Sequence, residues 1–243
     1  QSLASLGPYC RDRGKPAYLI NATLQNNSSG IYENIASFRG VWVRETASSE
    51  ALGAYGIQHL ICPDLSLLAN YPQGGEPVRE LLLTDSVHGP SIEILTAFSR
   101  RSGLPVVSMK RDPQTGLSMV ANSSPPPDKF PVVDDRAIEC STSNAFAIYL
   151  AQHRRIITGR YHAACMAIAM NIPLHALPSN TFKIEAMIGD IGLDPSRMLG
   201  NRATAASIPD HQPFTAEELT AITTYRARAR AEADRMMAEI LCF

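Results

Sequence analysis

The sequence predicts an α/β protein made of two halves, each built on a parallel β-sheet. Short apolar runs alternate with segments of helical periodicity along most of the 243 residues, and this alternation is typical of strand–helix–strand units. Residues 69–78, which are rich in proline and glycine, interrupt the alternation and predict a boundary between the halves. Apolar residues make up 45% of the chain and charged residues 19%, as in packed globular proteins.

Three apolar runs predict the strands of the N-terminal half, which we expect to span residues 1–72. These runs are Lys15–Ala22, Gly40–Arg44 and His59–Cys62. Residues 31–38 and 46–55 have helical patterns, and Gly56 closes the second of them. The half is therefore expected to form a parallel sheet with helical connections.

The C-terminal half, residues 73–213, repeats the alternation of strands and helices. The predicted strands are residues 80–84, 104–108, 155–158 and 173–177, and the predicted helices are residues 91–101, 142–152, 161–170 and 181–188. A loop-rich stretch that includes Ser123–Pro127 lies between the second strand and the second helix.

The tail, residues 214–243, predicts one long amphipathic helix that packs back on the body of the protein. It opens with a capping box, Thr215-Ala216-Glu217-Glu218. Apolar residues then recur at helical spacing, at Leu219, Ile222, Tyr225, Ala229, Ala233, Met236 and Ile240. The arginines and acids that alternate between them, from Arg226 to Arg235, predict a solvated face.

Composition and charge exclude several classes of partner. A formal charge of -1 and a pI near 6.7 give no bulk attraction to nucleic acid or to an anionic membrane surface, so we expect no nucleic-acid partner. No apolar run approaches the roughly 18 residues of a membrane helix, and no charged-then-apolar leader opens the chain. The five cysteines are scattered, with no Cys-x-x-Cys pair, which indicates buried thiols in a reducing compartment. We therefore expect a cytoplasmic protein, at most peripheral to the inner face of the membrane.

Reactive side chains gather in three loops that follow predicted strands of the C-terminal half. These loops carry Ser86 and His88, then Arg160 and His162, then Ser179, Asn180 and Lys183. Ligands of parallel sheets bind beyond the carboxyl ends of the strands, and these ends share one edge of the sheet. We therefore expect the three loops to converge there, at a site that includes Thr158–His162.

The residue types in these loops favour an anionic substrate. A helix that starts at Gly-Arg-x-His presents unpaired N–H groups and a partial positive charge to a phosphate or carboxylate. Arg160 offers a bidentate fork, Lys183 a second cation, and His162 a group that transfers protons near neutral pH. This combination predicts a substrate that is both phosphorylated and carboxylated.

Each of these residues also has a purely structural interpretation. His162 could cap its helix, Arg160 could hold a carboxylate within the fold, and Lys183 could be solvated. His88 lies in a sequence that is also typical of an ordinary turn with proline at a helix entry. The acidic pair Asp134-Asp135 is isolated, so we expect no metal site.

The segment Ile157–Ala164, followed by Ile172-Pro173 and Lys183, resembles the polysaccharide pyruvyl transferase family. That family has an apolar strand, a small residue, Arg-x-His, an Ile-Pro strand and a lysine. Upstream, Val43–Ser48 and Cys62–Leu67 are similar to its second signature, an Arg-Asp/Glu-x-x-Ser helix start followed by a Pro-Asp pair. The likeness runs from about Pro16 to Leu193.

The resemblance implies two Rossmann-like halves of glycosyltransferase-B type with the active site in the cleft between them. It implies transfer of a pyruvyl group from phosphoenolpyruvate to a sugar of a cell-surface glycan or of its lipid-linked precursor, with release of phosphate and without a cofactor. Arg160 and Lys183 would hold the phosphate and carboxylate of the donor, and His162 would be the acid/base.

The resemblance also bears on the N-terminal half. Arg44 and Asp64 fall at motif positions that line the cleft or support it, and we count Arg44 among the substrate-binding candidates. Family members have a further strand–helix portion and a glycine-rich loop ahead of the segment that corresponds to residues 16–22. We therefore expect the N-terminal half of this chain to be incomplete.

Two other functions fit the same residues. On the same fold, a glycosyltransferase would use Arg160 and Lys183 to neutralise the diphosphate of a nucleotide sugar and His162 as the base. A catalytically incomplete domain would instead bind a glycan or a partner chain through the tail helix.

Overall fold

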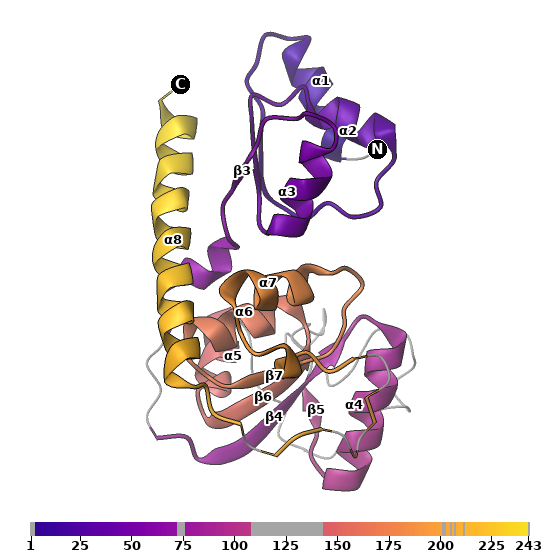
Figure 1. Cartoon of the computed structure of the whole chain (residues 1–243), viewed down its shortest axis with the longest axis vertical. Helices are drawn as coiled ribbons and strands as arrows, with labels where there is room; N and C mark the ends of the chain where they lie inside the picture. Colours follow the sequence, from indigo (N-terminus) through magenta and orange to yellow (C-terminus); the bar gives the residue numbers. More distant parts are fainter. Residues whose placement is uncertain are drawn as a thin grey trace. The chain divides into compact units, whose positions relative to one another are not determined.

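The computed structural model describes residues 3–71, 76–107 and 143–242, apart from residues 201, 202, 205, 207 and 211. The chain divides into two compact units (Figure 1). The N-terminal unit comprises Gln1–Leu68 and Thr224–Phe243, and the C-terminal unit comprises Ala69–Thr223. Each unit holds helices and one parallel sheet, which confirms the α/β class and is consistent with Rossmann-like halves.

The N-terminal unit has a three-stranded sheet of order β1-β2-β3. Both strand pairs are parallel. Its elements are the 3-10 helix Leu3–Ser5, α1 (Leu6–Arg11), β1 (Tyr18–Ala22), α2 (Ser29–Ile35), β2 (Gly40–Val43), α3 (Thr46–Gly53), β3 (Leu60–Ile61) and the 3-10 helix Leu65–Leu68. All three strands and both helices predicted for this half are present, with α2 beginning two residues earlier than residue 31.

The C-terminal unit has a four-stranded sheet of order β5-β4-β6-β7, and its described strand pairs are all parallel. Its elements are β4 (Arg79–Ser86), α4 (Gly89–Ser102), β5 (Val106–Val107), α5 (Ser143–Leu150), β6 (His153–Gly159), α6 (Tyr161–Ala169), β7 (Leu174–Ala176), α7 (Lys183–Ile191), the 3-10 helix Pro195–Arg197 and the start of α8 (Ala216–Leu241). Leu81–Ser86 of β4 are buried without interruption, which is typical of a strand covered on both faces. The predicted loop Ser123–Pro127 lies outside the described residues.

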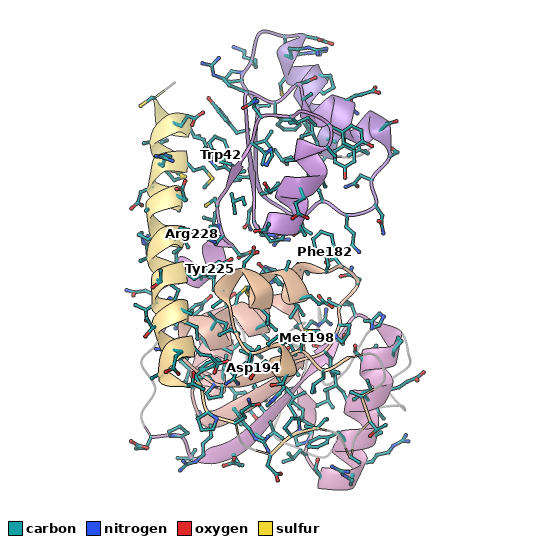
Figure 2. The ribbon with its side chains drawn as sticks, viewed as in Figure 1. Trp42, Phe182, Asp194, Met198, Tyr225 and Arg228 are labelled. Carbon is teal, nitrogen blue, oxygen red and sulfur yellow. The ribbon has the colours of Figure 1, made fainter. Side chains whose placement is uncertain are left out.

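Each unit has its own apolar core. In the C-terminal unit, strand residues such as Leu83 and Ile157 pack against Leu95 and Phe98 of α4. In the N-terminal unit, Trp42 of β2 (labelled in Figure 2) is 1% exposed. It belongs to one buried cluster with Cys62, Ala233 and Met236. Residues of α8 after Thr224 therefore complete the core of the N-terminal unit.

The predicted capping box at the start of α8 is confirmed. The N–H of Glu218 donates to Thr215 Oγ1 at 3.2 Å, and the N–H of Thr215 donates to Glu218 Oε2 at 2.9 Å. Leu219 differs from the prediction, because it is 38% exposed. The buried position one turn before Ile222 belongs to Glu218, so Leu219 faces outward.

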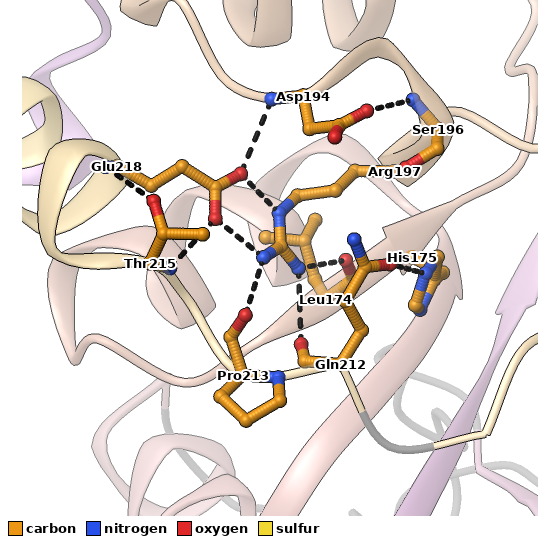
Figure 3. Close-up of polar contacts among 9 residues, drawn as sticks. All are labelled: Leu174, His175, Asp194, Ser196, Arg197, Gln212, Pro213, Thr215 and Glu218. Carbon is orange, nitrogen blue, oxygen red and sulfur yellow. Dashed lines mark hydrogen bonds and ion pairs between the residues drawn. The ribbon is translucent and has the colours of Figure 1, made fainter.

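Glu218 is buried because it pairs with Arg197, which is fully buried (Figure 3). Both Nε and Nη2 of Arg197 donate to the carboxylate of Glu218 at 2.6 Å, and Nη2 also donates to the carbonyl of Pro213 at 2.8 Å. The backbone N–H of Asp194 donates to Glu218 Oε1 at 3.1 Å. Hydrogen bonds from Arg197 are the largest cause that lowers the pKa of Glu218 to about 2.

The cysteines are less uniform than predicted. Cys62 and Cys165 are buried, Cys10 is partly buried and Cys242 is exposed. All four are free, whereas Cys140 lies outside the described residues. The exposed Cys242 directly follows α8.

Candidate functional site

The carboxyl ends of β4, β6 and β7 lie side by side in the sheet of the C-terminal unit. Ser86 pairs with Gly159, and Thr158 pairs with Ala176 in parallel register. The loops that leave these strands therefore start from one edge. Ser91 at the start of α4 donates a hydrogen bond to the carbonyl of Pro178 at 2.7 Å, which ties the first loop to the third.

Gly159 allows the closest approach between two of these strands. A Cβ added at Gly159 would lie 2.4 Å from both Cβ and Oγ of Ser86. The side chain of Ser86 therefore occupies the space that any other residue at position 159 would need. Ser86, a predicted substrate-binding residue, is 2% exposed, and its Oγ accepts a hydrogen bond from the N–H of His88 at 3.1 Å. Its position indicates a role in shaping the loop.

We expect Gly159→Ala to destabilise the protein by about 1–3 kcal/mol, because the new methyl group overlaps Ser86. Urea unfolding followed by circular dichroism measures this loss. Gly189→Ala in α7 is the matched control, because nothing lies within 4 Å of its added Cβ, and it should be neutral or stabilising. The double variant Ser86→Gly/Gly159→Ala should recover most of the loss. Equal stability of Gly159→Ala and Gly189→Ala would contradict the close approach.

Two buried threonines fix the backbone that leads into α6. Thr158 Oγ1 accepts hydrogen bonds from the N–H of Arg160 at 2.9 Å and from the hydroxyl of Thr84 at 2.5 Å. Both threonines are 0% exposed. Arg160 is the N-cap residue of α6 and has extended backbone angles, so its side chain leaves the strand at a defined point.

Arg160 forms a bidentate ion pair with Asp85 at the end of β4. Nε donates to Asp85 Oδ1 at 2.7 Å, and Nη2 donates to Oδ2. The side chain of Arg160 is 14% exposed and that of Asp85 3%. The structural interpretation of Arg160, that it holds a carboxylate within the fold, is therefore what the structure shows, and Asp85 offsets much of its charge.

Tyr161 is the common neighbour of His162 and Lys183. The rings of Tyr161 and His162 meet edge to face with centroids 5.6 Å apart, and Lys183 Nζ lies 5.6 Å from the centroid of Tyr161. Tyr161 is 5% exposed, whereas His162 is exposed and Lys183 is half-buried. The structure thus brings the predicted acid/base and the predicted second cation to the same aromatic side chain, at the amino ends of α6 and α7.

His88 lies against Ser91 and close to Glu185. Its Nδ1 is 3.1 Å from Ser91 Oγ. Burial raises the pKa of Glu185 above its usual value of 4.5, and the nearby charge of His88 partly opposes this rise. Glu185 Oε2 is buried and has no hydrogen-bond partner among the described residues. The first turn of α7 therefore contributes a buried carboxyl group with a raised pKa.

The other two candidates of the third loop lie at the surface of the unit. Ser179 is half-buried and Asn180 is exposed, and the hydroxyl of Ser179 donates to Asn180 Oδ1 at 3.4 Å. Their predicted contact with substrate stays a prediction.

Arg44 lies in the N-terminal unit, in a polar network of its own. Nη1 donates to Asp64 Oδ2 at 2.8 Å, and Nε and Nη2 donate to Thr23 Oγ1 at 3.1 and 2.6 Å. Burial alone would raise the pKa of Asp64, but hydrogen bonds from Ser66 and Arg44 lower it overall. The carboxylate of Glu45 bonds the hydroxyl of Ser48, which in turn accepts the N–H of Leu24. Arg44 therefore holds β1, β2 and the Pro63-Asp64 turn together.

Sequence reasoning missed Asp85 and Glu185 as members of this edge. Asp85 lies at the end of β4 and Glu185 in the first turn of α7, close to predicted residues, but an acid at such a position is common and does not reveal its partner. The parallel register of Ser86 with Gly159 brings Asp85 next to Arg160. The signal available in the sequence was the position of Asp85 directly after an apolar strand.

The described residues contain neither a cluster of metal ligands nor a helix that could span a membrane. In this part of the chain, no group of three or more His, Cys, Asp or Glu side chains could hold a metal ion. Within the same residues, none of the helices combines the length and the apolar character needed to cross a bilayer. The acidic pair Asp134-Asp135 lies outside the described residues.

The carboxyl edge of the sheet in the C-terminal unit brings together cationic side chains, the amino ends of two helices and groups that can carry protons. Lys183 and the positive dipole ends at the starts of α6 and α7 favour an anion. His162 and Glu185 offer groups for proton transfer. The arrangement suits the transfer of an anionic group to an uncharged acceptor.

Comparison with known proteins agrees with this chemistry. Residues 3–181 match the profile of a family described as polysaccharide pyruvyl transferase. No curated protein matches the chain significantly. A crystal structure of a functionally uncharacterized protein from Klebsiella pneumoniae is 14% identical, with a TM-score of 0.49, and the match covers 82% of this chain and 70% of that one. Since the family match spans well over half of the chain, the protein belongs to the polysaccharide pyruvyl transferase family, a family of transferases.

Proposed function

We propose that this protein transfers a pyruvyl group from phosphoenolpyruvate to two hydroxyl groups of a sugar in a cell-surface polysaccharide or its lipid-linked precursor. The contact of Lys183 and His162 with the same Tyr161 ring carries the proposal, because it joins an anion-binding group to a proton carrier. The glycosyltransferase-B type of fold and a cytoplasmic location belong to the same proposal. The four free cysteines among the described residues support the latter.

The donor requires binding of two anionic groups that lie at opposite ends of a small molecule. Lys183, at the first position of α7, supplies a cation at the positive end of the helix dipole. The N–H groups at the start of α6 supply a second anion-binding point. Asp85 accepts hydrogen bonds from Nε and Nη2 of Arg160. We therefore assign two roles to Arg160: its ion pair with Asp85 fixes the start of α6, and its remaining nitrogen, Nη1, binds the donor.

The proton balance of the reaction explains the need for an acid/base group. Two sugar hydroxyls form bonds to C2 of phosphoenolpyruvate, and the bond from C2 to the phosphate oxygen breaks. One hydroxyl proton ends on C3, which becomes a methyl group, and the other leaves with phosphate. His162 in the first turn of α6 carries these protons in the proposed mechanism, because an imidazole both accepts and donates protons near neutral pH.

Ligand-induced stabilisation of the full chain tests the donor. Phosphoenolpyruvate at about 100 times its Kd adds about 2.7 kcal/mol of stability, so we expect the Tm to rise by on the order of 5–10 °C. Lys183→Gln should reduce this rise. Lys15→Gln, which removes an exposed lysine of the N-terminal unit, is the matched control and should keep it.

Nucleotide sugars are the informative comparison ligands. A rise in Tm with phosphoenolpyruvate but not with UDP-glucose supports pyruvyl transfer. A rise with UDP-glucose alone would reject the proposal in favour of a glycosyltransferase. Loss of the phosphoenolpyruvate effect in Lys15→Gln as well as in Lys183→Gln would reject the assignment of Lys183.

A further inference from the structure

The C-terminal unit has a cavity at the opposite ends of the strands that carry the candidate site. It measures about 570 Å³, a size typical of small-molecule pockets. Arg79 pairs with His153, and Leu81 pairs with Arg155, so these four side chains lie on one face of β4 and β6. β4 continues from Arg79 to Ser86, roughly 20 Å further on at the rise of a strand.

Arg155 places a buried positive charge in the wall of this cavity. It is only 9% exposed, and its Nη1 donates to the carbonyl of Pro209 at 2.8 Å. Its Nε is buried and has no hydrogen-bond partner among the described residues. It forms an ion pair with Oε1 of Glu80 at 3.7 Å, a distance that is too long for a hydrogen bond. A buried guanidinium N–H that lacks an acceptor favours binding of an anion.

The charges that line the cavity fit a ligand with a single negative charge. Arg79 and Arg155 are positive, and Glu80 is negative and shared with Arg154 on the surface. Burial is the main cause that lowers the pKa of His153 to about 4, so its ring is neutral at pH 7. The lining therefore carries a net charge of about +1, which a carboxylate balances and a phosphate dianion exceeds.

The rest of the lining is apolar and comes from α4 and the segment that follows it. Phe98 and Ser102 lie on α4, and Leu104 and Pro105 lead from it toward β5. Arg79 is held in place by Tyr149, since its Nη1 donates to Tyr149 Oη at 3.1 Å. The cavity thus offers a fixed cation on one side and an apolar wall on the other.

We propose that this cavity binds a small organic acid, with its carboxylate on Arg155 and Arg79 and its apolar body against Phe98 and Leu104. The proposal is independent of the donor and acceptor of the transferase reaction. It adds to the protein a second ligand site, at the amino ends of the same strands whose carboxyl ends form the candidate active site.

Benzoate is a suitable probe, because it combines one carboxylate with one apolar ring. Titration of the isotope-labelled full chain, followed by backbone amide NMR, should give saturable shift changes at Leu81, Phe98 and Ser102. For a ligand of this size we expect a Kd on the order of 1 mM. Benzamide, which has the same shape without charge, and inorganic phosphate, which lacks the ring, should each bind at least about tenfold more weakly.

Variants distinguish this cavity from the candidate active site. Arg155→Gln and Arg79→Gln should each weaken benzoate binding by about tenfold or more. Arg79 is half-buried, so its variant keeps the test valid if Arg155→Gln fails to fold. Arg100→Gln, an exposed arginine of α4 outside the lining, and Lys183→Gln should both bind as the wild type does. Binding that survives in both Arg155→Gln and Arg79→Gln, equal binding of benzamide, or an absence of saturable shifts would overturn the proposal.

Discussion

Glu218→Ala is expected to lower the free energy of unfolding by about 3–5 kcal/mol, because it leaves the buried guanidinium of Arg197 without its carboxylate. Arg197 is 0% exposed, so water cannot replace the lost partner. The backbone N–H groups of Asp194 and Thr215 would lose their acceptor as well. Urea unfolding followed by far-ultraviolet circular dichroism measures the change.

Glu217→Ala is the matched control for this prediction. Glu217 lies in the same first turn of α8 and carries the same charge, but it is exposed. Its loss should cost far less than that of Glu218, since its carboxylate is exposed to water and has no buried cation as a partner in the described part of the chain. The double variant Arg197→Met/Glu218→Leu removes both charges, and it should cost less than Glu218→Ala alone. If Glu217→Ala and Glu218→Ala were equally destabilised, the buried pair would not have the role that we assign to it.

The pH dependence of unfolding gives a second readout of the same pair. The pKa of Glu218 is about 2 in the folded protein, against 4.5 for an unperturbed glutamate. The carboxylate therefore stabilises the fold fully above pH 4.5, and this contribution of about 3 kcal/mol is lost as the pH falls toward 2. Glu218→Gln should lose this part of the acid transition. His153 affects the stability at higher pH. Its pKa is about 4 in the folded protein against 6.5 for an unperturbed histidine, so the unfolded chain binds the proton more readily and the fold loses stability as the pH falls from 6.5 toward 4.

Hydrophobic periodicity predicted the elements of the fold because most of them bury a continuous apolar face. β6 and α6 are buried almost throughout, so no polar residue masks where the strand ends and the helix begins. Periodicity failed at Leu219, where a polar residue with a specific partner takes the buried position. Such partners are distant in the sequence, as Arg197 is from Glu218, and no local pattern reveals them.

The sequence predicted which loops form the candidate site, but it did not predict which side chains contact each other there. Parallel strands imply that the loops share an edge, and that much follows from the alternation of strands and helices. The pairing of Arg160 with Asp85 depends on the register of β4 and β6, which apolar residues on both faces do not specify. Arg44 shows the same limit, because its partners Asp64 and Thr23 come from separate turns of the N-terminal unit.

We expect His162→Ala to lower kcat by about 10²–10⁴-fold and to leave phosphoenolpyruvate binding largely intact. The size of the loss is that of removing one general acid/base, and binding persists because the anion contacts come from other groups. Turnover is measured as phosphate released from phosphoenolpyruvate with a set of sugar acceptors, and binding as the rise in Tm. Arg160→Ala should show the opposite pattern, since loss of its contacts with Asp85 and with donor weakens binding itself.

His162→Gln separates proton transfer from hydrogen bonding at the same position. Glutamine retains a donor and an acceptor but cannot carry a proton between substrate groups, so this variant should be as slow as His162→Ala. His59→Ala is the matched control, because this histidine bonds Ser49 and Ile57 in the N-terminal unit. Full activity of His162→Gln would assign His162 to positioning the substrate. Glu185, whose buried carboxyl already has a raised pKa, would then be the group that carries the proton.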